Sequence, residues 1–112
     1  MRSILTSLPE GVVVVDKDLR IQVWNRLAED LWGLRQDEAI GQHLLALDIG
    51  LPLEHLQPTL KAVLAGQPGA EVELAAVNRR GKSVRVRVGA TPLAEGRAEP
   101  TGSVLVMHLL SD

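Results

Sequence analysis

The segment from Gly11 to Gly33, GVVVVDKDLRIQVWNRLAEDLWG, constrains the fold more than any other part of the chain. Four consecutive valines at 12–15 predict a strand that is covered on both faces, because β-branched residues favour strands and a half-exposed strand alternates with polar residues. A polar turn at 16–18 leads into 20–24, where polar and apolar residues alternate. The short connection predicts an antiparallel hairpin.

A helix is predicted directly after this hairpin. Asn25 can cap it, because its side-chain oxygen can accept a hydrogen bond from an N–H group of the first turn. Gly33 can end it, because glycine readily adopts the left-handed conformation found past helix ends. Apolar residues at helical spacing, with Gly and Pro at the boundaries, predict further helical segments. The predicted helical segments are 26–31, 36–39 and 57–66.

The second half of the chain predicts strands. Apolar residues alternate with charged residues over 71–76 and 83–89, and the turn Asn-Arg-Arg-Gly at 78–81 joins the two segments. The last strand, 103–110, is apolar on both faces and therefore needs cover on both. This order predicts an α+β domain with a five-stranded antiparallel sheet and helices packed on one face.

Composition excludes several classes of protein. A chain of 112 residues suits one domain, 1–112. It has no cysteine, which excludes thiol catalysis and disulfides, and no basic stripe, which argues against nucleic-acid binding. No apolar run approaches the roughly 20 residues that span a bilayer, and no signal peptide is evident, so we expect a cytoplasmic protein without a membrane partner.

No catalytic or metal-binding motif is evident either. The histidines lack the short spacing of a metal site, and the serines lack a nucleophile-elbow context. The acidic pairs 29–30 and 37–38 lie near helix starts, where carboxylates usually sit in water. Gly-Lys-Ser at 81–83 lacks the earlier glycine of a phosphate-binding loop. We therefore expect a protein that is not an enzyme and holds no metal.

Four segments together resemble a PAS domain. They are SLPEGVVVVDKDLRIQVWN (7–25), AEDLWGL (28–34), DEAIGQ (37–42) and NRRGK (78–82), and the resemblance extends over 4–110. It implies a sensory or interaction module in bacterial signal transduction, of the two-component or chemotaxis type. Such modules either bind a small molecule or cofactor between sheet and helices, or bind nothing and mediate dimerisation. For this chain we expect a homodimer, with small-ligand binding left open, that serves an attached or partner signalling domain such as a kinase or methyltransferase.

The resemblance also suggests a finer relationship and an alternative function. The segment HLLALDIGLP (43–52) is similar to PAS segments attached to bacterial chemoreceptor methyltransferases. No cofactor is predicted, but a haem- or flavin-binding redox or gas sensor is the alternative. His55 would be the iron ligand if haem is bound. Gln42 or Asn78 could contact a flavin ring edge, although both are also typical of exposed turns.

The fold predicts an aliphatic interior and an apolar outer sheet face. We expect these side chains to line the space between sheet and helices: Val14, Ile21, Leu31, Leu44, Leu60, Val86 and Val106. The second apolar face of the last strand predicts a homodimer interface made of Ile4, Leu5, Leu8, Leu105, Met107 and Leu109. Trp32 is expected in the core and Trp24 at a strand edge. His108 shares a face with Val104 and Val106, and the sequence leaves open whether that face is core or surface.

Overall fold

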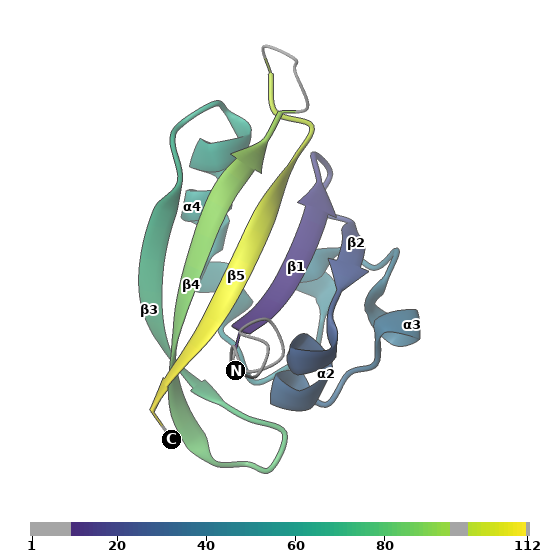
Figure 1. The fold of residues 1–112 in the computed structure, drawn as a ribbon, viewed down its shortest axis with the longest axis vertical. Coiled ribbons are helices and arrows are strands. Elements are labelled where there is room, and N and C mark those ends of the chain that lie inside the picture. The colour runs from purple at the N-terminus through teal and green to yellow at the C-terminus, as the bar shows by residue number, and fades with distance from the viewer. Residues whose placement is uncertain (1–9, 95–98, 112) are drawn as a thin grey trace, which may run out of the picture.

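The computed structural model describes residues 10–94 and 99–111, which form one five-stranded antiparallel sheet with helices packed on it (Figure 1). The strands are β1 (Glu10–Asp16), β2 (Ile21–Trp24), β3 (Ala70–Val77), β4 (Ser83–Leu93) and β5 (Gly102–Ser111). Their order in the sheet is β2-β1-β5-β4-β3, so β1 and β5 lie side by side although they come from opposite ends of the chain. The predicted α+β class is confirmed.

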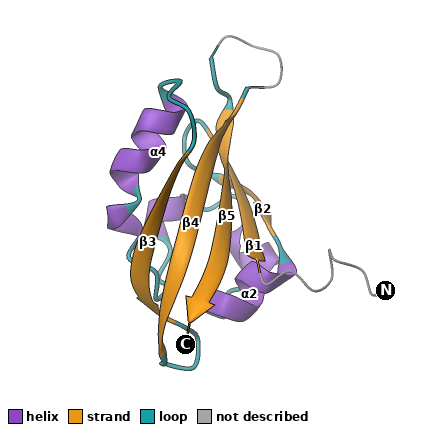
Figure 2. Cartoon of the chain, turned by 60° about the vertical axis from the view of Figure 1, so that its left-hand side comes forward, coloured by secondary structure: helices purple, strands orange, loops and turns teal. Residues whose placement is uncertain are grey.

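The helices within residues 10–94 and 99–111 all come between β2 and β3 in the chain. They are α2 (Arg26–Trp32), α3 (Gln36–Ala39) and α4 (Gln57–Leu64), with 3-10 turns η1 (Leu44–Ala46) and η2 (Leu53–His55). Pro58 stands in the first turn of α4, where its missing N–H costs no intrahelical bond. Figure 2 shows α4 along the β3 side of the twisted sheet and α2 near β1. No helix in the described part of the chain is both long enough and apolar enough to cross a membrane.

The β1–β2 turn is held by one aspartate. Asp16 Oδ1 accepts hydrogen bonds from the backbone N–H groups of Asp18 and Arg20, both at 2.9 Å. Leu19 takes a φ of 64° in this turn, a conformation that non-glycine residues rarely adopt. The aspartate therefore stabilises a turn that the chain would not otherwise favour.

Asn25 joins α2 to the sheet. Its Oδ1 accepts from the N–H of Ala28 at 3.0 Å, which is the predicted cap, and from the N–H of Val12 on β1 at 2.9 Å. Its Nδ2 donates to the carbonyl of Glu10 at 3.3 Å. One side chain thus fixes both where the helix begins and how it sits against β1.

The core lies between the sheet and the helices. Trp32 is buried there as predicted. Trp24 was expected at a strand edge, but its side chain is only 1% exposed. Its Nε1 donates to the carbonyl of Leu34 at 2.7 Å, so the ring is buried without an unpaired N–H. The fully buried strand residues on this inner face include Val13, Val15, Val86, Val88, Leu105 and Met107.

Two strands present the opposite face from the one predicted. Leu105 and Met107 are 0% exposed and face the helices, and Leu109 packs against the same core, so their assignment to the outer sheet face was wrong. Val14 and Val106, expected to line the interior, are half-buried on the outer face. Strands β1 and β5 are apolar on both faces, so apolar character alone does not say which face turns inward.

The remaining dimer-face residues of the sequence prediction are not part of the described structure. Ile4, Leu5 and Leu8 fall outside residues 10–94 and 99–111. Their assignment to an interface stays a prediction.

Replacing Asn25 tests whether this one side chain stabilises the packing of α2 against the sheet. Asn25→Ala removes two accepted hydrogen bonds and one donated bond, and we expect a loss of about 2 kcal/mol in the free energy of unfolding, measured by urea denaturation. Asn25→Asp keeps the accepting oxygen and loses only the donor, so it should cost clearly less. Equal losses for the two variants would contradict the capping role.

Candidate functional site

The predicted interior residues pack as core. Ile21, Leu44, Leu60 and Val86 are 0% exposed and Leu31 is 7% exposed, all within one hydrophobic cluster. Leu31 also borders a surface hollow with Asp30 and residues 78–80, whereas the other four residues line none of the hollows whose walls are made wholly of described residues. The structure therefore brings the five together as packed core.

Trp32 adds a polar contact to this core. Its Nε1 lies 3.3 Å from the sulfur of Met107 and donates to it across the space between α2 and β5. Both side chains are buried, so the indole N–H is paired without water. This contact ties the helix layer to the central strand of the sheet.

The residues considered for a cofactor lie at the surface or hold turns. His55 is exposed in η2, so its imidazole does not face the core as an axial haem ligand would have to. Gln42 is exposed, and Asn78 Oδ1 accepts from the N–H groups of Arg80 and Lys82 at 2.9 and 3.0 Å. Among residues 10–94 and 99–111, no cluster of three or more His, Asp or Glu could hold a metal ion.

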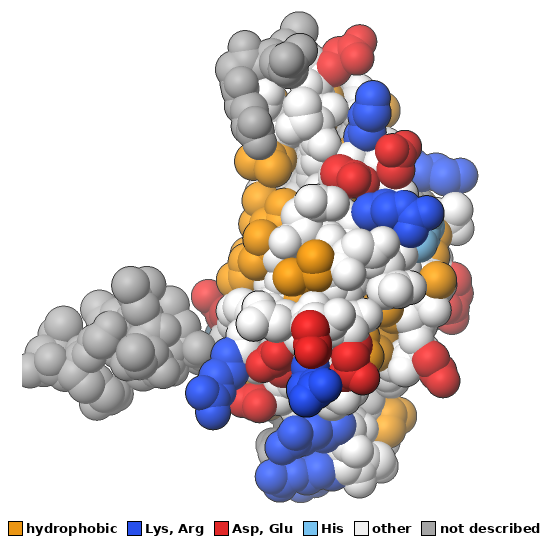
Figure 3. Space-filling model, turned by 90° about the vertical axis from the view of Figure 1, so that its right-hand side faces the viewer, with side chains coloured by type: hydrophobic (Ala, Val, Ile, Leu, Met, Phe, Trp, Pro, Cys, Tyr) orange, Lys and Arg blue, Asp and Glu red, His pale blue; other side chains and the backbone are white. Residues whose placement is uncertain are grey.

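The outer face of the sheet carries a continuous group of valines, which we call the valine patch. It consists of Val12, Val14, Val23, Val104 and Val106. Register places Val12 beside Val106, and Val14 between Val104 and Val23, so the patch crosses β2, β1 and β5. Val23 is 42% exposed and the other four are half-buried. Hydrophobic side chains also gather along the left-hand margin of the view in Figure 3.

A line of polar side chains borders this patch, and we call it the charged row. Glu10, His108, Arg87 and Glu73 follow one another across β1, β5, β4 and β3 in register. His108 therefore lies on the surface side of β5, which answers the question that the sequence left open. The row mixes acidic and basic groups next to an apolar surface.

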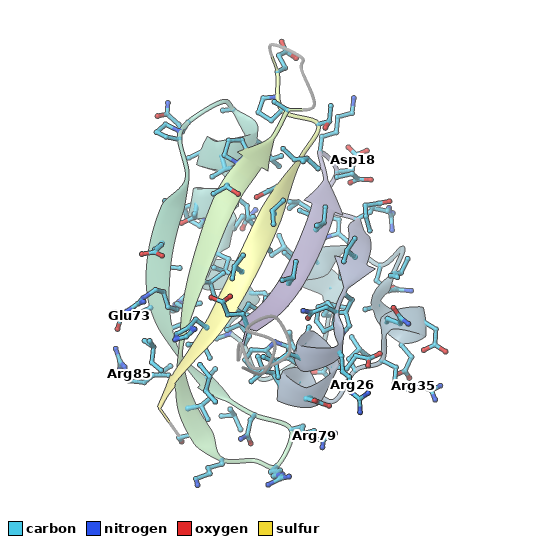
Figure 4. The ribbon with its side chains drawn as sticks, viewed as in Figure 1. Asp18, Arg26, Arg35, Glu73, Arg79 and Arg85 are labelled. Atoms are coloured by element: carbon cyan, nitrogen blue, oxygen red, sulfur yellow. The ribbon has the colours of Figure 1, made fainter. Side chains whose placement is uncertain are left out.

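Contacts in and beside the row are weak. His108 Nδ1 lies 3.6 Å from Glu10 Oε2 and has no hydrogen-bond partner among the described residues. Glu73 pairs at 3.3 Å with Arg85, which lies two residues before Arg87 on β4, and Figure 4 shows both at the β3–β4 edge. The Glu73 and Arg85 side chains are about half exposed, so their pair contributes little to stability.

The tip of the β3–β4 hairpin is basic and is fixed to α2. Arg79, Arg80 and Lys82 are all exposed there, and the N–H of Arg79 donates to the carbonyl of Leu31 at 3.1 Å. Figure 4 shows Arg79 pointing away from the sheet. The tip is thus anchored by its backbone and leaves its charges to solvent.

Sequence reasoning missed the valine patch because it assigned the wrong face, although a signal was present. Glu10 and Asp16 have even residue numbers in β1, as Val12 and Val14 do. Since alternate residues share a face, these polar ends mark the even-numbered face as the outer one. His108 marks the face of Val104 and Val106 in β5 in the same way.

Comparison with known proteins agrees with this architecture. The family model described as PAS fold matches residues 1–110. This chain belongs to the PAS family. The sequence resemblance to PAS domains is thereby confirmed for the family as a whole.

Solved PAS structures show the same fold. A PAS domain from Colwellia psychrerythraea is 21% identical, with a TM-score of 0.75 over 93% of this chain and 88% of that one. A sensory box sensor histidine kinase from Vibrio cholerae is 13% identical, with a TM-score of 0.77 over 97% and 87%. The VqmA dimer of Vibrio cholerae is 18% identical, with a TM-score of 0.80 over 97% of this chain and 51% of that one. The histidine kinase is named as a sensor and VqmA is described with LuxR-type receptors, and none of the three is named as a methyltransferase.

Two neighbouring substitutions on β5 test the face assignment. Leu105→Ala removes a fully buried side chain and should cost about 2–5 kcal/mol of unfolding free energy. Val106→Ala lies on the outer face and should cost less than about 1 kcal/mol. Urea denaturation in dilute solution measures both. A larger loss for Val106→Ala than for Leu105→Ala would contradict the assignment.

Proposed function

We propose that this PAS domain is a regulatory module without enzymatic activity, which acts as a homodimer through the outer face of its sheet. The observation that carries the proposal is the valine patch, in which five β-branched apolar side chains share one face turned away from the helices. A contiguous apolar surface of this kind is typical of an interaction site. The earlier expectation of a homodimer is kept, with Val104 and Val106 in place of Leu105 and Met107.

Burial of the patch supplies the attraction. Removing a valine side chain fully from water is worth up to about 1.5–3 kcal/mol, and the five are at present only partly covered. Association also costs translational and rotational freedom, so the patch supports a dimer of moderate affinity. Such a dimer can form and separate in response to a signal.

The charged row supplies selectivity for a second copy of the same chain. A two-fold dimer presents the same surface from both sides, so the surface must be complementary to itself. The row and its neighbours include three acidic side chains, Glu10, Glu71 and Glu73, and two basic ones, Arg85 and Arg87. Opposite charges on the two copies can therefore meet at the border of the patch.

The similar proteins support a signalling role. VqmA of Vibrio cholerae is described as a dimer and has been solved bound to DPO, and another similar structure is a sensor histidine kinase. We propose that this domain likewise serves an attached or partner signalling domain, such as a kinase or methyltransferase. A small ligand would have to enter a core that is packed with aliphatic side chains, so we place regulation by association first.

The proposal predicts that the purified domain forms a dimer that the outer face controls. In sedimentation velocity at high micromolar concentration, we expect wild-type protein to be dimeric. Replacing both Val104 and Val106 with glutamate should give a folded monomer, because it adds buried like charges to the interface. Circular dichroism would show that the fold is retained.

Ile40→Glu is the matched control. Ile40 is 45% exposed at the end of α3, on the helical side of the molecule, so its replacement should leave the dimer intact. A wild-type protein that remains monomeric at high concentration, with the double variant changing nothing, would remove the proposal.

A further inference from the structure

Gly89 lies on the outer face of the sheet, on the strand next to the edge strand β3. It lies on β4 in register between Glu71 of β3 and Val106 of β5. Glycine in the interior of a strand weakens it, because it has no side chain to pack and loses more conformational freedom on folding. Where it occurs, it commonly marks a bulge, a bend, or a point where another group comes close.

Nothing in the described part of the domain requires glycine here. The register shift on β4 falls between Arg85 and Val86, away from this position, and Gly89 does not have a positive φ. A Cβ added to Gly89 would lie 3.6 Å from Glu71 Cγ and 3.8 Å from Glu71 Oε2, which is ordinary contact. A Cβ would fit, so the glycine has no evident role within the described part of the domain.

The missing side chain leaves the face hollow. A hollow of about 510 Å³ and a smaller one of about 180 Å³ both have Glu71, Gly89 and Val106 in their walls. Arg87, His108 and Glu10 also border the smaller hollow. Val106 belongs to the valine patch, so the hollow is continuous with the proposed interface and has charged groups of both signs along its border.

We infer that the space above Gly89 receives an apolar side chain from the valine patch of a second copy of this chain. We call this space the seat. The inference rests on the proposed homodimer and identifies a contact beside the valine patch, next to Val106. A second copy suits the site because its own patch is apolar and its own charged row carries both signs. A uniformly acidic or basic partner would place like charges against Glu10 and Glu71 or against Arg87.

Gly89→Val tests this inference through two measurements that should move in opposite directions. Valine favours strands and fits beside Glu71, so the urea midpoint of dilute, monomeric protein should rise or stay unchanged. The same side chain fills the seat, so the dimer dissociation constant from sedimentation equilibrium should rise roughly tenfold or more. Gly89→Ala adds only a Cβ and should weaken the dimer to a smaller extent.

Ala75→Val is the matched control for the added bulk. Ala75 is an exposed outer-face residue of β3 that lies in neither of the two hollows. We expect this variant to leave the dissociation constant unchanged.

The possible results separate this inference from the proposed dimer. Suppose that the wild-type protein is a dimer, that the glutamate variants at Val104 and Val106 disrupt it, and that Gly89→Val does not change its dissociation constant. This result would contradict the role of Gly89 and would still support the proposed dimer. A marked loss of stability in dilute Gly89→Val or Gly89→Ala protein would show that the glycine serves the fold, and would also overturn the inference. A wild-type protein without any dimer removes both.

Discussion

The two-residue alternation of the two central strands is the constraint on which the rest of the structure depends. Strand β1 pairs along its whole length with residues 102–108 of β5, so the inward and outward residues of the two strands are fixed together. With Val13, Val15, Leu105 and Met107 turned inward, the helices cover an unbroken aliphatic layer. A shift of one residue in either strand would exchange the faces and expose that layer.

The same alternation creates the outer face and its proposed use. Turning Leu105 and Met107 inward leaves Val104, Val106 and His108 outward, beside Val12 and Glu10 of β1. The domain thus has an apolar surface that its described helices do not cover, next to a row of charges. The core and the proposed interface are two consequences of one register.

The sequence predicted most of the fold because the local signals were strong. Asn25 was identified as a helix cap, and Pro58 marked the first turn of α4, because each rests on interactions within a few residues. Strand β4 was harder to predict, since Pro92 and the residues after it are typical of a loop. In the structure β4 extends to Leu93, because pairing with the start of β5 stabilises residues that have little strand preference of their own.

The candidate site was less predictable for a physical reason. Where both faces of a strand are apolar, hydrophobicity does not distinguish the face that meets helices from the face that meets a partner. Trp24 was misplaced for a related reason, since its burial depends on the carbonyl of Leu34 ten residues later. Contacts between distant residues decide both cases, and composition and spacing do not reveal them.

A nuclear Overhauser experiment on the Met107 methyl group tests the central claim most directly. The chain has only two methionines and two tryptophans, so the signals can be assigned with confidence. With Met107 Sδ 3.3 Å from Trp32 Nε1, we expect strong Overhauser effects from the Met107 methyl to the Trp32 indole protons. Effects to Trp32 from the Val106 methyls instead, with none from Met107, would show the opposite strand face turned inward and contradict the account.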